Sequence, residues 1–360
     1  MKPIAVKSAS DLGPQFMDNP HRMVGQDGAF SIPLSDGTSL WYFGDTVVGK
    51  RTPGDSLWYE GNVPIGGLDM SGKRGIEYMP NNCGLILRDR TGAHGLRHFT
   101  YILNEQNRLR TLLPLEGDEH RDRDRIWCQH GIEIDGRLIL SFIKVITFEE
   151  PRWPFPVGFE IIGSGLAVGS REDWNFTRIT QGGDSVLWKA EQPHFGVAFL
   201  LPHVEDGFVY VYGSVARKEN QFCHIARVPR AEITKPDAYR YFDGTNWSES
   251  IDAAVPVLDG MPSEVSISWN AHLGAYLAVH SQLISGQIVG KTSSTPWGPW
   301  SKATLLWHAK PQYPIPEPYI PLIYAGKEHP CLSDQNGKVI YITYIEFEEY
   351  YPHLIRVELE

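Results

Sequence analysis

Two aspartates near the N-terminus have the neighbours and the spacing that acid–base chemistry requires. Asp27 stands in Val-Gly-Gln-Asp-Gly-Ala and Asp45 in Trp-Tyr-Phe-Gly-Asp-Thr, so each has an adjacent glycine. Strands disfavour aspartate, and glycine permits a close approach of backbone or ligand, so the pair needs an explanation. One explanation is two turn or capping carboxylates, the commoner role of an Asp-Gly step. The other is a carboxylate pair that exchanges protons with a substrate.

The element that would position both aspartates is a β-hairpin over residues 24–49. Two apolar runs flank Asp36-Gly37, and Asp-Gly between such runs is a strong hairpin signal. Folding about this turn places Asp27 almost opposite Asp45, at the open end of the hairpin, as a cross-strand or diagonal pair. The sequence therefore predicts that the two carboxyl groups lie together.

The hairpin pattern recurs along the chain. Four later segments also contain a polar residue, an apolar strand, a tight turn and a second apolar strand. Repeats of this kind, with no helical periodicity between them, predict four-stranded sheets arranged radially. We therefore expect an all-β, five-bladed β-propeller that forms a single domain over residues 1–360. Its blades would start near residues 24, 127, 193, 263 and 328.

The first strand of each propeller blade lines the central axis, so equivalent strand starts meet at one mouth of the funnel. A single histidine at such a position is more often a structural hydrogen-bonding group than a functional one. Several polar positions in register favour a shared site, which Asp45 would join through its hairpin. The polar residues at the predicted strand starts are Asp27, His130, His194, Glu264 and His329.

The composition narrows the class of ligand. The net charge is −10, and the acidic residues are spread along the chain, which argues against a nucleic-acid or anionic-membrane surface. Aromatic residues without basic clusters fit a neutral polar partner such as carbohydrate. Four tryptophans are candidates for stacking on sugar rings, although a core position is the commoner role for each of them. They are Trp41, Trp58, Trp127 and Trp269.

Neither the cysteines nor the N-terminus indicates a cofactor or an anchor. Cys83, Cys128, Cys223 and Cys331 have no CxxC spacing and no paired histidines, so we expect buried thiols, no metal and no other cofactor. The N-terminus lacks an apolar signal core, and no stretch approaches the roughly 18 apolar residues of a membrane span. The chain is therefore expected to be cytoplasmic, or exported with its signal removed.

Two further segments carry expectations of their own. Residues 50–80 are rich in glycine and proline and are long enough for a functional insertion. Residues 116–125 contain many charges, which predicts a solvated loop.

Several motifs resemble a family of five-bladed propellers long catalogued as a domain of unknown function, some of whose members are endo-D-arabinanases, a class of glycoside hydrolase. The resemblance covers most of the chain, and it implies that Asp27 and Asp45 match the two aspartates implicated in catalysis. The motifs are Gly25-Gln-Asp-Gly, Trp41-Tyr-Phe-Gly-Asp-Thr, His194-Phe-Gly, Val209-Tyr-Val-Tyr-Gly, Ala226-Arg-Val-Pro, Ser263-Glu-Val-Ser-Ile-Ser-Trp-Asn, Gly298-Pro-Trp and Glu328-His-Pro.

This resemblance favours a glycoside hydrolase that acts on furanosidic, arabinan-like glycans. Glycosidic cleavage needs one carboxylic acid to protonate the departing oxygen and a second carboxylate as nucleophile or base. Two like charges close together raise one pKa, which supplies the acid. Glu264 would tune the Asp27–Asp45 pair or act as the acid itself. The expected substrate-binding residues are His130, His194, His329, Trp41 and Trp127.

Two other functions compete with hydrolysis. A non-catalytic carbohydrate-binding propeller would need no acid pair, so the presence of Asp27 and Asp45 counts modestly against it. A polysaccharide lyase would need basic residues in the funnel to neutralise a uronate. None of the predicted strand-start motifs has Lys or Arg at its key position, which disfavours the lyase.

Overall fold

The computed structural model describes residues 3–52, 54–217, 220–260 and 264–360. Strands dominate these residues, and the expectation of an all-β fold is confirmed. None of the helices there is long and apolar enough to cross a membrane. Those helices are short 3-10 turns, namely η1 (Arg230–Glu232), η2 (Pro236–Ala238), η3 (Ile251–Ala253), η4 (Pro330–Leu332) and η5 (Gln335–Gly337).

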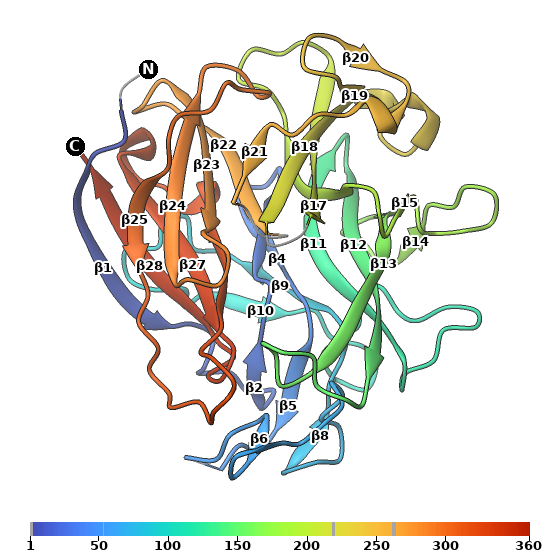
Figure 1. Cartoon of the computed structure of the whole chain (residues 1–360), viewed down its shortest axis with the longest axis vertical. Coiled ribbons are helices and arrows are strands. Elements are labelled where there is room, and N and C mark those ends of the chain that lie inside the picture. The colour runs from blue at the N-terminus through green and yellow to red at the C-terminus, as the bar shows by residue number, and fades with distance from the viewer. Residues whose placement is uncertain (1–2, 53, 218–219, 261–263) are drawn as a thin grey trace.

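Within the described residues, five antiparallel sheets contain four or more strands, and the first four are built from consecutive chain segments (Figure 1). The first sheet contains β3 (Phe30–Pro33), β4 (Ser39–Phe43), β9 (Cys83–Leu87) and β10 (Phe99–Tyr101). The second sheet contains β11 (Asp124–Ile134), β12 (Arg137–Phe148), β13 (Gly158–Gly169), β14 (Phe176–Arg178) and β15 (Trp188–Lys189). The third sheet contains β16 (His194–Leu200), β17 (Phe208–Arg217), β18 (Asn220–Pro229), β19 (Arg240–Phe242), β20 (Trp247–Ser248) and β21 (Leu258–Asp259). The fourth sheet contains β22 (Val265–Asn270), β23 (Ala275–Ser281), β24 (Gln287–Ser293) and β25 (Thr304–His308).

The fifth sheet joins the two ends of the chain. It contains β26 (Ile323–Glu328), β27 (Val339–Glu346), β28 (Pro352–Leu359) and, on its outer edge, β1 (Val6–Pro14). β1 runs antiparallel to β28 from Val6 opposite Leu359 to Pro14 opposite His353. Figure 1 shows the dark blue N-terminal strand beside the red C-terminal ones. The N-terminal strand therefore covers an edge that the C-terminal strands would otherwise expose.

The first strands of the five sheets follow one another in space. β3 lies beside β11, β11 beside β16, β16 beside β22 and β22 beside β26, while η4, directly after β26, lies against β3. All five strands line one cavity of 340 Å³. A start near residue 263 was expected for the fourth unit; position 263 lies outside the described residues, and β22 begins at Val265.

The apolar core is divided among the interfaces between these sheets. Five separate clusters of buried side chains join the first sheet to the fifth, the first to the second, the second to the third, the third to the fourth and the fourth to the fifth. Each sheet therefore buries both faces, which explains why strands such as β27, Val-Ile-Tyr-Ile-Thr-Tyr-Ile-Glu, are buried along their whole length.

Residues 50–80 fold into structure of their own rather than a simple connector. β2 (Met23–Gln26), β5 (Thr46–Gly49) and β8 (Ile76–Tyr78) form a three-stranded sheet, and β6 (Tyr59–Glu60) pairs with β7 (Val63–Pro64). These strands lie at the lower end of the molecule in Figure 1. Trp58 is buried there, and its indole N–H donates to the Phe347 carbonyl at 2.9 Å.

The expectation of a solvated loop over residues 116–125 is wrong for several of its charges. The Glu119 side chain is only 4% exposed and pairs with Arg178 at 2.8 Å and with Lys144 at 2.9 Å. Asp124 and Arg125 are also buried, at the start of β11. The local sequence shows only alternating charges, because the cations that pair with Glu119 come from distant strands.

The closure by β1 is testable through stability. Deleting residues 1–14 leaves the β28 edge unpaired, so the midpoint of thermal unfolding should fall by about 10 °C or more. Lys7→Gln removes only an exposed ion pair with Glu358 and should leave the midpoint nearly unchanged. Differential scanning calorimetry measures both. An unchanged midpoint after the deletion would contradict the closure.

Candidate functional site

Two strand ladders meet at Asp27 and Asp45. β3 pairs with β4 on one side of the two aspartates and β2 pairs with β5 on the other. Asp27 lies between β2 and β3, Asp45 lies between β4 and β5, and the Gly44 N–H donates to the Asp27 carbonyl at 3.0 Å. The hairpin thus brings the aspartates to neighbouring positions. They do not lie at its open end, because strand pairing resumes beyond them.

Glycine is required on both sides of this junction. A Cβ at Gly44 would lie 2.5 Å from Asp27 Oδ1, so only glycine leaves room for the carboxylate in its present position. Gly28 has a φ of +81°, and a Cβ there would lie 2.6 Å from Cys128 Sγ. The glycines beside Asp27 and Asp45 therefore allow a carboxylate to pack directly against the backbone.

Asp27 is partly exposed, and its surroundings favour the protonated carboxyl group. The Tyr324 hydroxyl donates to its Oδ2 at 2.9 Å, and Tyr350 is a second hydrogen-bonding neighbour. Burial, followed by the charges of Asp45 and Glu264, raises the pKa of Asp27 to about 8. Asp27 therefore carries a proton near neutral pH.

Asp45 is buried, with 1% of its surface exposed, but it has a cation and a donor beside it. The Trp127 indole N–H donates to Oδ2 at 2.9 Å, and Arg125 Nε lies 3.8 Å from Oδ1. Burial raises the pKa of Asp45 to about 7, while Arg125 and Trp127 act to lower it. Asp45 therefore ionises more readily than Asp27.

Glu264 completes the group of carboxylates. Lys327 Nζ lies 3.3 Å from its Oε1, and the same ammonium donates to the carbonyls of Ala325, at 2.8 Å, and Gly28. Burial raises the pKa of Glu264, and Lys327 opposes that rise. The buried lysine thus ties Glu264 to the backbone beside Asp27, and the structure brings all three carboxylates together.

His329 and Trp41 are not available to a substrate, so the expectation that they bind one is wrong. Both are fully buried, and their rings stack with centroids 4.3 Å apart. Both ring nitrogens of His329 are hydrogen-bonded within the protein: Nδ1 to Ser31 Oγ at 2.8 Å and Nε2 to Thr343 Oγ1 at 2.7 Å. Their role is to hold sheets one and five together.

His130 and His194 are also occupied by the protein. The Phe199 N–H donates to His130 Nδ1 at 3.0 Å, so its Nε2 carries the hydrogen and faces the Ser31 carbonyl at 3.3 Å. Burial lowers the pKa of His130 to about 4. His194 is buried at the start of β16, with its Nε2 3.2 Å from the Ala190 carbonyl. Neither histidine hydrogen-bonds a carboxylate of the cluster within the described residues.

The predicted register fails where strands begin earlier and contain bulges. β11 begins at Asp124 and is irregular between Cys128 and Gly131, so His130 lies well inside the strand rather than at its start. β26 begins at Ile323 and is irregular between Tyr324 and Lys327. Residues at the level of the aspartates are therefore Arg125, Trp127, Tyr324 and Lys327, instead of His130 and His329.

Sequence reasoning missed the cations and tyrosines of the site. Arg125 and Lys327 face the carboxylates, so the argument that the funnel lacks basic residues does not hold. Both cations already have carboxylate partners, however, and neither is free to neutralise a uronate. The only local signal was a pair of adjacent opposite charges beside an apolar strand, as in Gly326-Lys-Glu-His and Asp124-Arg-Ile-Trp.

A concave surface of 400 Å³ adjoins this cluster. Arg125 links them, because its Nη2 lies 3.4 Å from Asp69 Oδ2 and its Nε faces Asp45. The lining includes residues 67–69, 71 and 73, Arg121, and residues 147–149. The segment between residues 50 and 80 therefore forms one wall of the candidate site, as the expectation of a functional insertion requires.

Comparison with known proteins identifies the family. Residues 13–356 match the family described as a domain of unknown function, DUF4185, and the chain belongs to it. No relative is found among proteins with curated descriptions.

Several solved structures share the fold. A provisionally named hydrolase from Bacteroides ovatus ATCC 8483 is 16% identical, with a TM-score of 0.61 over 97% of this chain and 87% of that chain. An exo-β-1,3-galactanase from Phanerochaete chrysosporium, bound to β-1,3-galactotriose, is 10% identical, with a TM-score of 0.51 over 98% of this chain and 65% of that one. The RS223 β-xylosidase is 11% identical, with a TM-score of 0.50 over 96% and 97%.

The proton on Asp27 has a measurable consequence for stability. The unfolded chain loses this proton near the ordinary pKa of 3.8, whereas the folded protein keeps it up to about 8, so stability falls as the pH rises through that window. Asp27→Asn removes this loss. The unfolding midpoint of the variant, relative to wild type, should therefore increase between about pH 5 and pH 8.

Asp69→Asn is the matched control with the opposite sign. Arg121 and Ser71 lower the pKa of Asp69 to about 2 despite its partial burial, so its charge stabilises the fold above its ordinary pKa. This variant should unfold at a lower temperature than wild type at pH 7. If Asp27→Asn instead became less stable relative to wild type as the pH rose, the assigned proton would be wrong.

Proposed function

We propose that this protein is a glycoside hydrolase built on a five-bladed β-propeller, with Asp27 and Asp45 as its catalytic pair. Five sheets whose first strands surround one cavity support the blade count, as do the core clusters between successive sheets. The observation that carries the proposal is the carboxylate cluster, in which neighbouring charges raise the pKa of one acid while cations stand beside the other two.

Asp27 is the general acid of this proposal. It is partly exposed, it holds a proton near neutral pH, and burial with two neighbouring negative charges keeps that proton in place. Protonating the glycosidic oxygen as the bond breaks requires such a group. Tyr324 donates to Asp27 Oδ2 and thereby orients the carboxyl group.

Asp45 is the nucleophile or the base that activates water. The Trp127 N–H and the Arg125 guanidinium both favour its ionised form, which either role requires. Glu264 is the third carboxylate, and its charge helps to keep Asp27 protonated. Lys327 limits the repulsion among the three groups by pairing with Glu264.

The proposed substrate is a furanosidic, arabinan-like glycan. The motifs around Asp27 and Asp45 resemble those of endo-D-arabinanases, and two of the structures that share the fold are named for glycan-cleaving enzymes, a β-xylosidase and an exo-β-1,3-galactanase. Trp127 is partly exposed beside Asp45, so its ring is available to a sugar while its N–H holds the carboxylate.

Nearly isosteric substitutions test the catalytic assignment. Asp27→Asn and Asp45→Asn should each lower turnover about 10²–10⁴-fold, the scale of positioned acid–base groups, and should leave glycan affinity largely intact. The assay is release of reducing ends from D-arabinan and L-arabinan, with Glu264→Gln compared alongside. Asp243→Asn, in an exposed turn, is the control and should keep wild-type activity.

Two outcomes would overturn parts of this assignment. Wild-type protein that binds these glycans without cleaving them would be a binding module. Full activity in both aspartate variants, with none in Glu264→Gln, would transfer the catalytic role to Glu264.

Trp127→Phe tests the tuning of Asp45 separately. Removing the N–H leaves Oδ2 without this donor, so the pKa of Asp45 should rise. The acidic limb of the pH–rate profile should consequently move to higher pH, with a smaller fall in maximal rate than in Asp45→Asn. An acidic limb that stays in place would mean that Asp45 does not act in its ionised form.

A further inference from the structure

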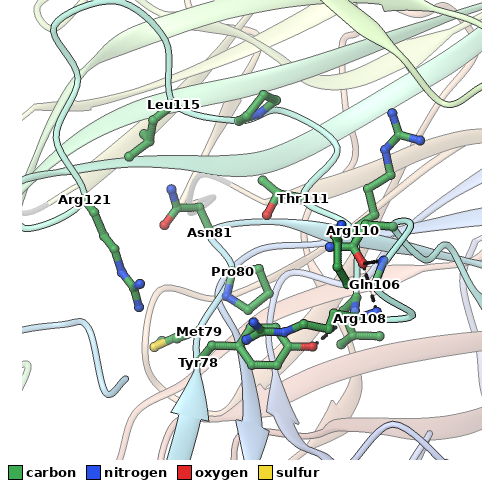
Figure 2. Close-up of a pocket in the computed structure, with 13 residues that line it drawn as sticks. Tyr78, Met79, Pro80, Asn81, Gln106, Arg108, Arg110, Thr111, Leu115 and Arg121 are labelled. Carbon is green, nitrogen blue, oxygen red and sulfur yellow. Dashed lines mark hydrogen bonds between the residues drawn. The ribbon is translucent and has the colours of Figure 1, made fainter. Parts of the chain in front are cut away.

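A second depression, of 630 Å³, shares Arg121 with the surface next to the carboxylates, and Figure 2 shows its lining. Arg121 lines both hollows. The Pro80 carbonyl, in the wall of this depression, accepts a hydrogen bond of 3.0 Å from the Thr46 N–H, directly after Asp45. The second depression is therefore connected by the backbone to the segment that holds the proposed nucleophile.

Its lining is cationic although the protein as a whole is acidic. Arg108, Arg110 and Arg121 line it, and the lining contains no Asp or Glu among the described residues, in a chain of net charge −10. Arg121 is paired with Asp69 at 2.6 Å, whereas Arg108 and Arg110 form no ion pair within the described ranges. The guanidinium of Arg110 does donate to the Asp173 carbonyl, at 2.8 Å, and to Asn175 Oδ1. Two guanidinium charges are thus left without a carboxylate.

Arg108 is held in position while its donors stay free. Its guanidinium carbon lies 3.8 Å from the centre of the Tyr78 ring, and the Tyr78 hydroxyl is fixed by the Leu109 N–H at 3.1 Å. Stacking on Tyr78 uses the face of the guanidinium and leaves the N–H groups at its edges free. These N–H groups donate no hydrogen bond to any described residue. Such a group is ready to bind an anion through two parallel hydrogen bonds.

Asn81 gives this depression a buried polar floor. It is only 8% exposed, it lines the hollow, and its side-chain amide has no hydrogen-bond partner in the part of the chain that the structure describes. The neighbouring Asn82, in contrast, makes three hydrogen bonds, to Leu113 and Ile126. Figure 2 shows Asn81 between Arg121 and the Arg108–Arg110 side. The Asn81 side chain is thus largely buried, while its amide group is free to hydrogen-bond a ligand in the hollow.

We propose that this depression is a second binding site, for an acidic group carried by a glycan. The group is a carboxylate or a phosphate ester, which share the negative oxygens that Arg108 would bind, with the charge of Arg110 nearby, while Asn81 donates its N–H to the same group or to an adjacent hydroxyl. The inference extends the proposed function by adding an acidic unit to the substrate, but binding does not depend on cleavage.

The test measures binding by isothermal titration calorimetry with the full-length Asp27→Asn protein, so that no probe is consumed. The carboxylate probe is trigalacturonate, compared with its neutral methyl ester. The phosphate probe is glucose 6-phosphate, compared with glucose. We expect at least one acidic probe to bind about tenfold or more tightly than its neutral counterpart, and this preference to fall as salt is added.

Variants assign the preference to this depression. Arg108→Gln removes the charge and Asn81→Asp adds an opposing one at constant size, so each should weaken the acidic probe about tenfold or more. Arg108→Lys keeps the charge and should retain most of the binding. Arg137→Gln, which removes an exposed arginine without an ion pair among the described residues, should change nothing.

Either of two results would overturn the proposal. One is the absence of any preference for an acidic probe over its neutral counterpart, and the other is a preference that survives both Arg108→Gln and Asn81→Asp. Hydrolysis of neutral arabinan by the otherwise wild-type Arg108→Gln protein tests the proposed function separately, since neither charge nor geometry at Asp27 changes. If the protein lacks hydrolase activity but binds the acidic probe through Arg108, the binding site is supported and the proposed glycoside hydrolase function is wrong.

Discussion

The candidate site depends on the repulsion among three carboxylates that share a poorly solvated space. Burial and like charge both favour protonation, and the protein offsets only part of this cost by placing Arg125 near Asp45 and Lys327 near Glu264. Asp27 has tyrosine hydroxyls as neighbours but forms no ion pair among the described residues, so its negative charge is the least compensated of the three. The arrangement separates the proton affinities of chemically identical side chains, as division into acid and base requires.

This arrangement is held by parts of the chain that are far apart in sequence. The aspartates come from the first hairpin, Arg125 from the second sheet, Glu264 from the start of the fourth and Lys327 from the fifth. The fifth sheet itself is completed by the N-terminal strand β1. The packing of these sheets against one another therefore fixes the site, and the packed interfaces leave little freedom for the charges to separate.

The same geometry places binding surface next to the chemistry. The inserted segment between residues 50 and 80 contributes Asp69 to the lining of the concave surface beside the carboxylates. Arg121 lines both that surface and the cationic depression. A glycan crossing this face would meet charges of both signs, with negative groups at the proposed scissile bond and positive groups farther along. Electrostatic complementarity of this kind contributes to specificity more than to affinity.

Local pattern was sufficient for the features that depend on neighbours in sequence. Alternating apolar runs with Asp-Gly turns predicted the all-β class, and the three-residue turn Ser35-Asp36-Gly37 between Leu34 and Thr38 set the register that brings Asp27 opposite Asp45. Tertiary structure decided the rest. Bulges in β11 and β26 shifted His130 and His329 away from the site, and partners from other sheets turned Arg125 and Lys327 into site residues. A bulge changes which side chain faces the axis, and a buried ion pair joins distant strands, so neither leaves a signal in the local sequence.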